Sequence, residues 1–220
     1  MEVLSEQKKI AFEQRFKNVV RDEPMASHTN FRIGGPARLY VIATSSDELL
    51  EMARFAQEQE IPFALYGGGS NLLVADEGYE GVVIQAGMRA IVFSGNEVMA
   101  EAGAITGLVA RQSVQNGLGG FEWAVGVPGT IGGAVYGNAG CYGGEMKDNV
   151  VTVDAIRLRD LEHVTLTNAE CDFGYRSSFF KKEPHLILST TLRIEAAADA
   201  ESSKARLQWV MDERKAKQPL

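Results

Sequence analysis

The sequence predicts a mixed α+β fold with several strands and about three or four helices. Most apolar segments of the 220-residue chain are short and are bounded by glycine turns, which is typical of strands. Few segments repeat apolar residues at helical spacing. The chain has 23 glycines, and two stretches, residues 66–74 and 126–140, are especially rich in them. Glycine persists mainly where the backbone takes a positive φ or approaches another group closely, so both stretches are candidate ligand sites.

Spacing and capping signals predict the elements of the N-terminal part. Residues 4–20 carry apolar residues at loose helical spacing and predict a short helix. Ser45 and Glu48 form a capping box in front of an amphipathic helix that ends near Glu60. Extended segments or strands are predicted over residues 30–36, 39–43, 62–65 and 72–74.

The same signals predict the elements of the C-terminal part. A helix is expected over residues 106–116, with Gly117 as the residue that ends it. Residues 198–217 return to helical composition. Strands are predicted over residues 82–85, 90–93, 98–102, 150–158, 164–166 and 186–194.

Composition and charge argue against several classes of function. The formal net charge of −7 argues against a nucleic-acid partner, since phosphate binding needs clustered lysine and arginine. No apolar run approaches the ~20 residues that span a bilayer, and the first residues contain no signal-peptide segment. A soluble cytoplasmic protein without membrane or nucleic-acid partners is therefore expected.

Cysteines and histidines predict no metal site. Cys141 and Cys171 and the three histidines show none of the spacings of metal ligands. The two cysteines are expected to be reduced and to pack in the fold. The alternative, a catalytic cysteine, has no neighbouring base in the sequence to support it.

The first glycine stretch follows a predicted strand directly and is typical of an anion-binding nest. Successive backbone N–H groups without side chains can converge on a phosphate, and Ser70 and Asn71 add side-chain donors at the rim. The stretch matches neither a Rossmann GxGxxG motif nor a P-loop, because no helical pattern follows it and it contains no lysine. A glycine-rich hairpin or bulge is the structural alternative.

The second stretch places glycines at three-residue steps with small residues between them. Such a segment can run close to a flat ring system and offer N–H and C=O groups to its polar edge. Pro128 and Gly129 are also a simple type II turn signal, which is the alternative. Asn138 and the aromatic residues Tyr136 and Tyr142 could contact a ligand or pack on neighbouring strands. The two stretches together favour an elongated, phosphate-bearing cofactor.

Four segments in order identify a resemblance to a known family. Residues 29–37, 66–71, 126–133 and 171–178 together resemble the UDP-N-acetylenolpyruvoylglucosamine reductases. The resemblance covers the chain from about residue 24 onward. Glycine loops like residues 67–71 occur widely among flavin-binding proteins, but all four segments in this order are specific.

The resemblance implies an α+β fold of the PCMH/vanillyl-alcohol-oxidase type, with two α+β subdomains and FAD between them. It implies FAD-binding subdomains over 24–92 and 93–196 and the start of a truncated substrate-binding domain over 197–220, and the helical spacing of the residues before them predicts an N-terminal helical segment over 1–23. Residues at matching positions are then expected to bind the FAD diphosphate, namely Gly67, Gly68, Gly69, Ser70, Asn71 and Leu72. Those expected along the ribityl chain and flavin ring are Val127, Pro128, Gly129, Thr130, Gly132, Gly133 and Ala134. Tyr66 and Asn138 are expected as further cofactor contacts.

The resemblance also implies the chemistry. NADPH reduces noncovalently bound FAD, which then reduces the enolpyruvyl ether of a UDP-sugar to UDP-N-acetylmuramate for peptidoglycan synthesis. Arg176 matches the active-site arginine of the family, where a guanidinium stabilises charge that develops on the substrate carboxylate. Without the surrounding motif, Arg176 would be read as a surface arginine. Neither a metal nor a nucleic acid is expected, and a monomer is favoured.

Substrate contacts are expected from Tyr175, Arg214 and Lys217, although a solvated, charged helix end is an equal alternative for the last two. The family continues beyond the position of Leu220 with a domain that carries a proton-donating serine and an assisting glutamate. The chain is therefore expected to be the FAD-binding part, incomplete for turnover alone. The alternative is a flavin-binding module of the same fold that is non-catalytic or has another specificity.

Overall fold

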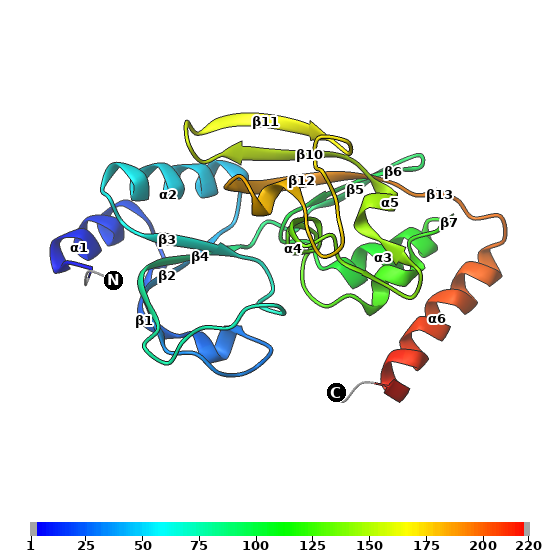
Figure 1. The fold of residues 1–220 in the computed structure, drawn as a ribbon, viewed down its shortest axis with the longest axis horizontal. Helices are drawn as coiled ribbons and strands as arrows, with labels where there is room; N and C mark the ends of the chain where they lie inside the picture. Colours follow the sequence, from blue (N-terminus) through cyan, green and yellow to red (C-terminus); the bar gives the residue numbers. More distant parts are fainter. Residues whose placement is uncertain (1–3, 218–220) are drawn as a thin grey trace. The chain divides into compact units, whose positions relative to one another are not determined.

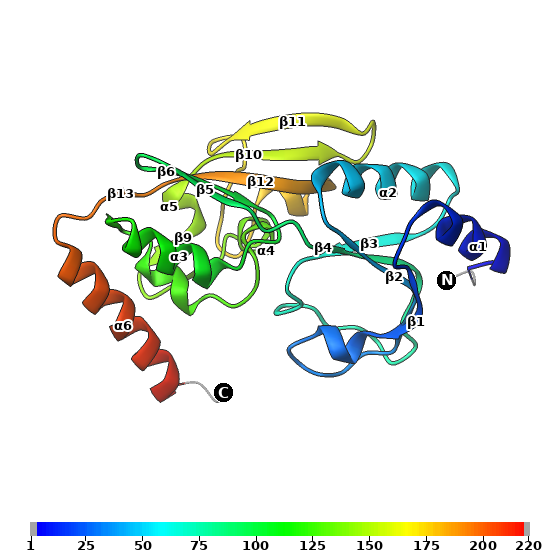
Figure 2. The same cartoon turned by 180° about the vertical axis from the view of Figure 1, so that it is seen from behind.

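The computed structural model of the protein describes residues 4–217. The backbone forms two compact units, Met1–Met88 and Arg89–Leu220, whose elements are labelled in Figures 1 and 2. The four-part division expected from the sequence stays a prediction, and its residues 1–3 and 218–220 lie outside the described part of the chain.

The first unit is built on a four-stranded sheet in the order β1-β2-β4-β3. Strands β2, β4 and β3 are parallel, and β1 runs antiparallel to β2. Helix α2 covers one face of the sheet through contacts with β2 and β4 (Figure 1). The elements are α1 (Glu6–Arg15), β1 (Val20–Pro24), the 3₁₀ helix η1 (Met25–His28), β2 (Pro36–Ala43), α2 (Ser46–Glu58), β3 (Phe63–Tyr66) and β4 (Tyr79–Ala86).

The N-cap predicted for the second helix is confirmed, but the reciprocal bond of the predicted capping box is not formed. Ser45 is the N-cap of α2, and its hydroxyl accepts from the backbone N–H of Glu48 at 3.1 Å. The Glu48 carboxylate returns to the backbone N–H of Thr44 at 2.6 Å rather than to that of Ser45. The bond from Glu48 satisfies one of the N–H groups that a helix start leaves without an intrahelical partner. The apolar face of α2 is fully buried at Leu49, Met52, Ala53 and Ala56.

The helix predicted over residues 4–20 is shorter in the structure. It ends at Arg15, and Val20 opens β1 opposite Tyr40 of β2. β-Branched residues such as Val19 and Val20 fit a pleated strand better than a helix, and Val20 pairs with β2.

Phe12 anchors α1 to α2. Its ring lies 4.7 Å from that of Phe16 and 5.9 Å from that of Phe55, and it is fully buried. We expect Phe12→Ala to lower the free energy of unfolding by about 3–5 kcal/mol, since it leaves a cavity among aromatic rings. Urea denaturation measures this change. Ile10→Ala is the matched control, because Ile10 lies on the same helix and is 43% exposed. An equal loss in both variants would contradict the assigned packing.

The prediction of a strand over residues 72–74 is wrong. This segment forms no ladder, and it is held at its end by Ala75, whose carbonyl accepts from the N–H groups of Gly35 and Gly78. Its apolar side chains, Leu72 and Val74, instead pack on a small cluster that includes the buried Met25. Their hydrophobicity reflects this packing and not strand pairing.

The second unit contains a five-stranded antiparallel sheet in the order β11-β10-β12-β6-β5. Helix α4 packs against β12 and β6, and α3 lies beside α6 (Figure 2). The strands are β5 (Ile91–Ser94), β6 (Glu97–Glu101), β7 (Leu118–Gly119), β8 (Gly140–Cys141), β9 (Gly144–Glu145), β10 (Val150–Arg157), β11 (Glu162–Thr167), β12 (His185–Arg193) and β13 (Glu195–Ala196). The helices are α3 (Thr106–Gln115), η2 (Glu122–Gly126), α4 (Ile131–Tyr136), α5 (Met146–Asn149), η3 (Phe179–Lys181) and α6 (Ala200–Lys217).

Most elements predicted for this unit are confirmed within a few residues. Gly117 follows α3 with φ +76°, as expected of a residue that ends a helix. Helix α4 was not predicted, because its sequence, IGGAVY, combines two glycines with β-branched residues. It forms because the N–H groups of Ile131 and Gly132 are bonded to Ala104 and Ala102 of the segment after β6.

Candidate functional site

The first glycine stretch follows β3 and forms an irregular loop. Hydrogen bonds to two of its backbone carbonyl groups hold the loop in place. The carbonyl of Gly67 accepts from Nε2 of Gln85 at 3.1 Å, and that of Gly69 accepts from the backbone N–H of Asn30 at 3.1 Å. In a trans peptide the N–H of the next residue points opposite to the carbonyl. The N–H groups of Gly68 and Ser70 therefore point away from Gln85 and Asn30.

The backbone at position 69 requires a glycine. Its φ is +65°, and a Cβ at this position would lie 1.9 Å from the carbonyl oxygen of His28. The turn that carries His28 therefore presses directly on the loop backbone. This close approach is the reason for glycine here, and it fits the expectation that one of these glycines permits backbone contact.

The remaining loop residues differ in exposure. Gly68 and Asn71 are exposed, while Tyr66, Gly67, Ser70 and Leu72 are partly buried. A loop with inward-turned carbonyls and small exposed residues has the donor set of an anion site. The structure thus fits a diphosphate at this loop.

The second glycine stretch combines a turn with the start of α4. Gly129 has φ +97°, the conformation that a type II turn requires at its third residue. The N–H groups of Val127, Gly132 and Ala134 are bonded to Ala124, Ala102 and Thr130 within the protein. Pro128, Gly133 and Tyr136 are the exposed residues of the stretch, and the Thr130 hydroxyl is buried without a hydrogen-bond partner.

Asn138 connects the end of α4 to two other segments. It is 2% exposed, and its Nδ2 donates to Oε2 of Glu145 at 2.6 Å and to the carbonyl of Gly174 at 3.0 Å. Its Oδ1 accepts from the backbone N–H of Lys147 at 3.0 Å. Asn138 thereby holds the turn that contains Arg176, a role that the sequence did not predict.

Arg176 lies at the tip of a tight turn. Gly174 and Ser177 exchange backbone hydrogen bonds of 3.0 and 3.1 Å, and Arg176 has φ +52°. Its side chain is exposed and lines a cavity of about 350 Å³. Tyr175, which is 92% exposed, and Asn138 line the same cavity. The structure therefore brings three of the predicted site residues together.

Arg214 and Lys217 have different partners on α6. Arg214 Nη1 donates to the carbonyl of Gly126, where the second glycine stretch begins. Lys217 pairs with Glu213 one turn away on the same helix, and its side chain is 70% exposed. Burial raises the pKa of the Cys141 thiol, and the positive charges of Arg214 and Arg176 oppose that shift. Both arginines therefore act electrostatically on the same strand, β8.

We expect Arg214→Met to lower the free energy of unfolding by about 1–2 kcal/mol, because it removes a charged donor from the Gly126 carbonyl. Lys217→Met is the control, since an exposed ion pair contributes less than about 1 kcal/mol. Thermal and urea unfolding of the 220-residue chain measure both. Equal stabilities of the two variants would show that the bond to Gly126 does not hold α6.

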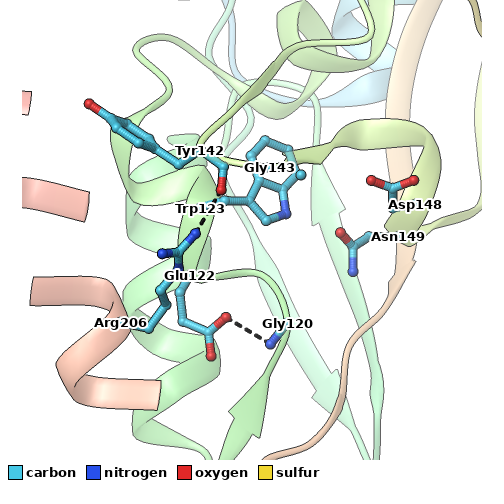
Figure 3. Close-up of a pocket in the computed structure, with 9 residues that line it drawn as sticks. Gly120, Glu122, Trp123, Tyr142, Gly143, Asp148, Asn149 and Arg206 are labelled. Atoms are coloured by element: carbon cyan, nitrogen blue, oxygen red, sulfur yellow. Dashed lines mark hydrogen bonds between the residues drawn. The ribbon is translucent and has the colours of Figure 1, made fainter. Parts of the chain in front are cut away.

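A second cavity of about 360 Å³ lies between α6 and the β8–β9 hairpin (Figure 3). Arg206 of α6 donates to the carbonyl of Tyr142 at 2.7 Å, and the buried Glu122 accepts from the N–H of Gly120 at 2.8 Å. Sequence reasoning did not select Arg206 or Glu122, because neither stands in a glycine-rich motif. The cavity shares Gly143, Gly144 and Asp148 with the cavity of Arg176.

Both cysteines are free, and burial raises the pKa of the Cys171 thiol to about 12. Among the described residues, no group of histidine, cysteine and acidic side chains could hold a metal ion. None of the described helices has the length and apolar character needed to cross a membrane.

Comparison with known proteins identifies the family. Residues 37–166 match the FAD binding domain family. The chain is 38% identical to the UDP-N-acetylenolpyruvoylglucosamine reductase of Caldanaerobacter subterraneus subsp. tengcongensis over 200 residues, covering 90% of this chain and 66% of that protein. It is 38% identical to the same reductase of Geobacillus thermodenitrificans over 207 residues, covering 93% and 67%.

A solved structure agrees with these sequence matches. The crystal structure of UDP-N-acetylenolpyruvylglucosamine reductase (MurB) from Thermus caldophilus superposes with a TM-score of 0.78 at 29% identity, covering 92% of this chain and 70% of that one. The predicted fold class, α+β of the FAD-binding PCMH/vanillyl-alcohol-oxidase type, is confirmed. The chain spans about two thirds of the length of the curated relatives it matches. It belongs to the UDP-N-acetylenolpyruvoylglucosamine reductase family and carries that family's FAD-binding domain.

Proposed function

We propose that this chain is the FAD-binding part of a reductase that uses NADPH to convert UDP-N-acetyl-3-O-enolpyruvylglucosamine to UDP-N-acetylmuramate in peptidoglycan precursor synthesis. The supporting observation is the similarity to the Geobacillus thermodenitrificans reductase over 93% of the chain, together with a cavity lined by Arg176, Tyr175 and Asn138. FAD, when bound, supplies the means to pass a hydride from NADPH to an electron-poor alkene. The activity is expected in the cytoplasm and in a monomer.

The first glycine loop is proposed to hold the diphosphate of FAD. Its support is the orientation of the peptides at Gly67 and Gly69, whose carbonyls are bonded inward to Gln85 and Asn30. Backbone N–H groups that point away from these internal partners are the donors that an anion needs. The second stretch is proposed to line the ribityl chain and flavin ring with the exposed residues Pro128 and Gly133.

Arg176 is proposed to act on the substrate carboxylate. Hydride addition at one alkene carbon builds negative charge on the adjoining carbon and its carboxylate. A fixed guanidinium lowers the barrier by stabilising that charge, and its planar donors suit a carboxylate better than an ammonium group. The turn that Asn138 fastens supports this role, because it fixes the backbone that carries Arg176.

Tyr175, Arg214 and Lys217 are proposed as substrate contacts. Tyr175 is almost fully exposed beside Arg176, and Lys217 extends from the end of α6. Arg214 is already bonded to Gly126, so any contact with substrate must use its other donors.

Turnover tests the proposal. The chain is loaded with FAD, reduced with NADPH without oxygen, and mixed with the enolpyruvyl UDP-sugar. The experiment is repeated with the C-terminal third of the Geobacillus thermodenitrificans relative fused to the chain. We expect stoichiometric reoxidation of the flavin by the sugar in the fusion. Flavin that NADPH reduces but the sugar never reoxidises would assign another substrate. Bound FAD that NADPH cannot reduce would instead favour a non-catalytic flavin-binding module.

A further inference from the structure

A chain of hydrogen bonds runs through the first unit and ends on the first glycine loop. The Tyr40 hydroxyl donates to Oε1 of Gln85 at 2.6 Å, and Gln85 Nε2 donates to the carbonyl of Gly67 at 3.1 Å. The Tyr40 and Tyr66 hydroxyls lie 3.2 Å apart. A hydroxyl has one proton, and that of Tyr40 goes to Gln85, so Tyr66 is the donor to Tyr40. The direction of donation is therefore fixed from Tyr66 through Tyr40 and Gln85 to the loop.

The residues around Tyr40 and Tyr66 keep these hydrogen bonds in one direction. Tyr40 is 5% exposed, and the ring of His28 stacks on it at 4.4 Å. His28 Nε2 in turn lies 2.8 Å from Oε1 of Glu23. Burial raises the pKa of both Tyr40 and Tyr66, so both hydroxyls keep their protons at neutral pH. Gln85 sits opposite Tyr66 in the pairing of β3 and β4, directly under the point where the loop begins.

We propose that Gln85, oriented by Tyr40, is a positioning residue that sets the peptide between Gly67 and Gly68 so that its N–H faces the FAD diphosphate. A glycine loop has little conformational preference of its own, because its backbone can adopt many φ and ψ values. The side-chain amide of Gln85 accepts on one side and donates on the other, so it fits only one peptide orientation. The inference rests on the proposed role of this loop and names the residue that gives the loop its shape.

The substitution Gln85→Glu tests this role. A carboxylate of the same size still accepts from Tyr40, but it repels the carbonyl of Gly67 and cannot hold the peptide. We expect FAD to bind about 10- to 100-fold more weakly at about pH 8, which corresponds to one charge-assisted hydrogen bond. Flavin fluorescence, titrated with the 220-residue chain, measures the dissociation constant. Gln115→Glu on the exposed end of α3 is the control for the added charge.

The pH dependence separates positioning from a general effect on the fold. Burial raises the pKa of the introduced carboxyl, and its protonated form can again donate to Gly67. The ratio of the dissociation constants of Gln85→Glu and the unchanged chain should therefore fall as the pH falls from about 8 to about 6. The unchanged chain corrects for every effect of pH on FAD binding that does not depend on residue 85. Tyr40→Phe, which keeps the stacked ring and removes one hydroxyl, should weaken FAD binding about 3- to 10-fold.

Two results would overturn the inference. One is FAD affinity in Gln85→Glu equal to that of the unchanged chain. The other is a weakening that does not change with pH and is matched by an equal loss of stability in urea. If the unchanged chain itself binds no FAD, the proposed role of the loop fails instead, so the two failures are distinguishable.

Discussion

Gly69→Ala is expected to abolish high-affinity FAD binding, with a dissociation constant at least about 100-fold higher than that of the unchanged chain. The new Cβ would lie 1.9 Å from the carbonyl oxygen of His28. Neither atom can move away by a side-chain rotation, because one is a backbone oxygen and the other is attached directly to the backbone. The loop must therefore shift. The shift breaks the bond from Asn30 to Gly69 and turns the following N–H group away from the diphosphate. Flavin fluorescence and the FAD content of the purified chain measure the effect.

Gly95→Ala is the matched control for this prediction. Gly95 has φ +61°, close to the +65° of Gly69, but nothing lies within 4 Å of a Cβ at Gly95. Both substitutions therefore carry the same left-handed backbone cost of about 1–2 kcal/mol, and only Gly69→Ala adds the clash. Gly95→Ala should retain its FAD. Equal FAD affinity in both variants would show that the approach of His28 does not shape the loop.

Arg176→Ala is expected to lower kcat about 10²- to 10³-fold in the fusion with the C-terminal third of the Geobacillus relative, while FAD content stays unchanged. The guanidinium is proposed to stabilise charge that forms only during hydride addition, so its loss affects the reaction and not flavin binding. Stopped-flow measurement of flavin reoxidation by the enolpyruvyl UDP-sugar isolates this step. Arg176→Lys should recover only part of the rate, because an ammonium group does not match a carboxylate with two parallel donors.

Arg159→Ala provides the control for charge, since Arg159 lies on the β10–β11 turn of the same unit with a side chain that is 69% exposed. Its reoxidation rate should equal that of the unchanged fusion. Loss of FAD from Arg176→Ala with normal turnover per bound flavin would contradict the proposed role of the arginine.

Sequence patterns predicted the regular elements well where one principle dominated. Ser45 capped α2 as predicted because its hydroxyl acts within one turn, and Gly117 ended α3 because few other residues adopt its positive φ. The helix over residues 4–20 was overextended because strand pairing between Val20 and Tyr40 is a long-range contact. Helix α4 escaped prediction for the same reason, since distant carbonyls at Ala102 and Ala104 hold its first turn.

The candidate site was predictable as a set of segments and not as a set of contacts. Motif order identified the loop around Gly69 and the turn around Arg176. It could not show that Gln85 holds the Gly67 carbonyl or that Arg214 binds Gly126, because both are side-chain contacts across long sequence separations. A single glutamine at a strand end carries no local signal. Such supporting residues become visible only when the structure shows which backbone group each one fixes.

Titration of the 220-residue chain with FAD, and separately with riboflavin, tests most directly whether the loop amides hold the diphosphate. The expected result is one noncovalently bound FAD per chain, released intact by denaturation, with riboflavin bound at least about 100-fold more weakly because it lacks the diphosphate. A chain that binds riboflavin as tightly as FAD, or that binds neither, would contradict the assignment.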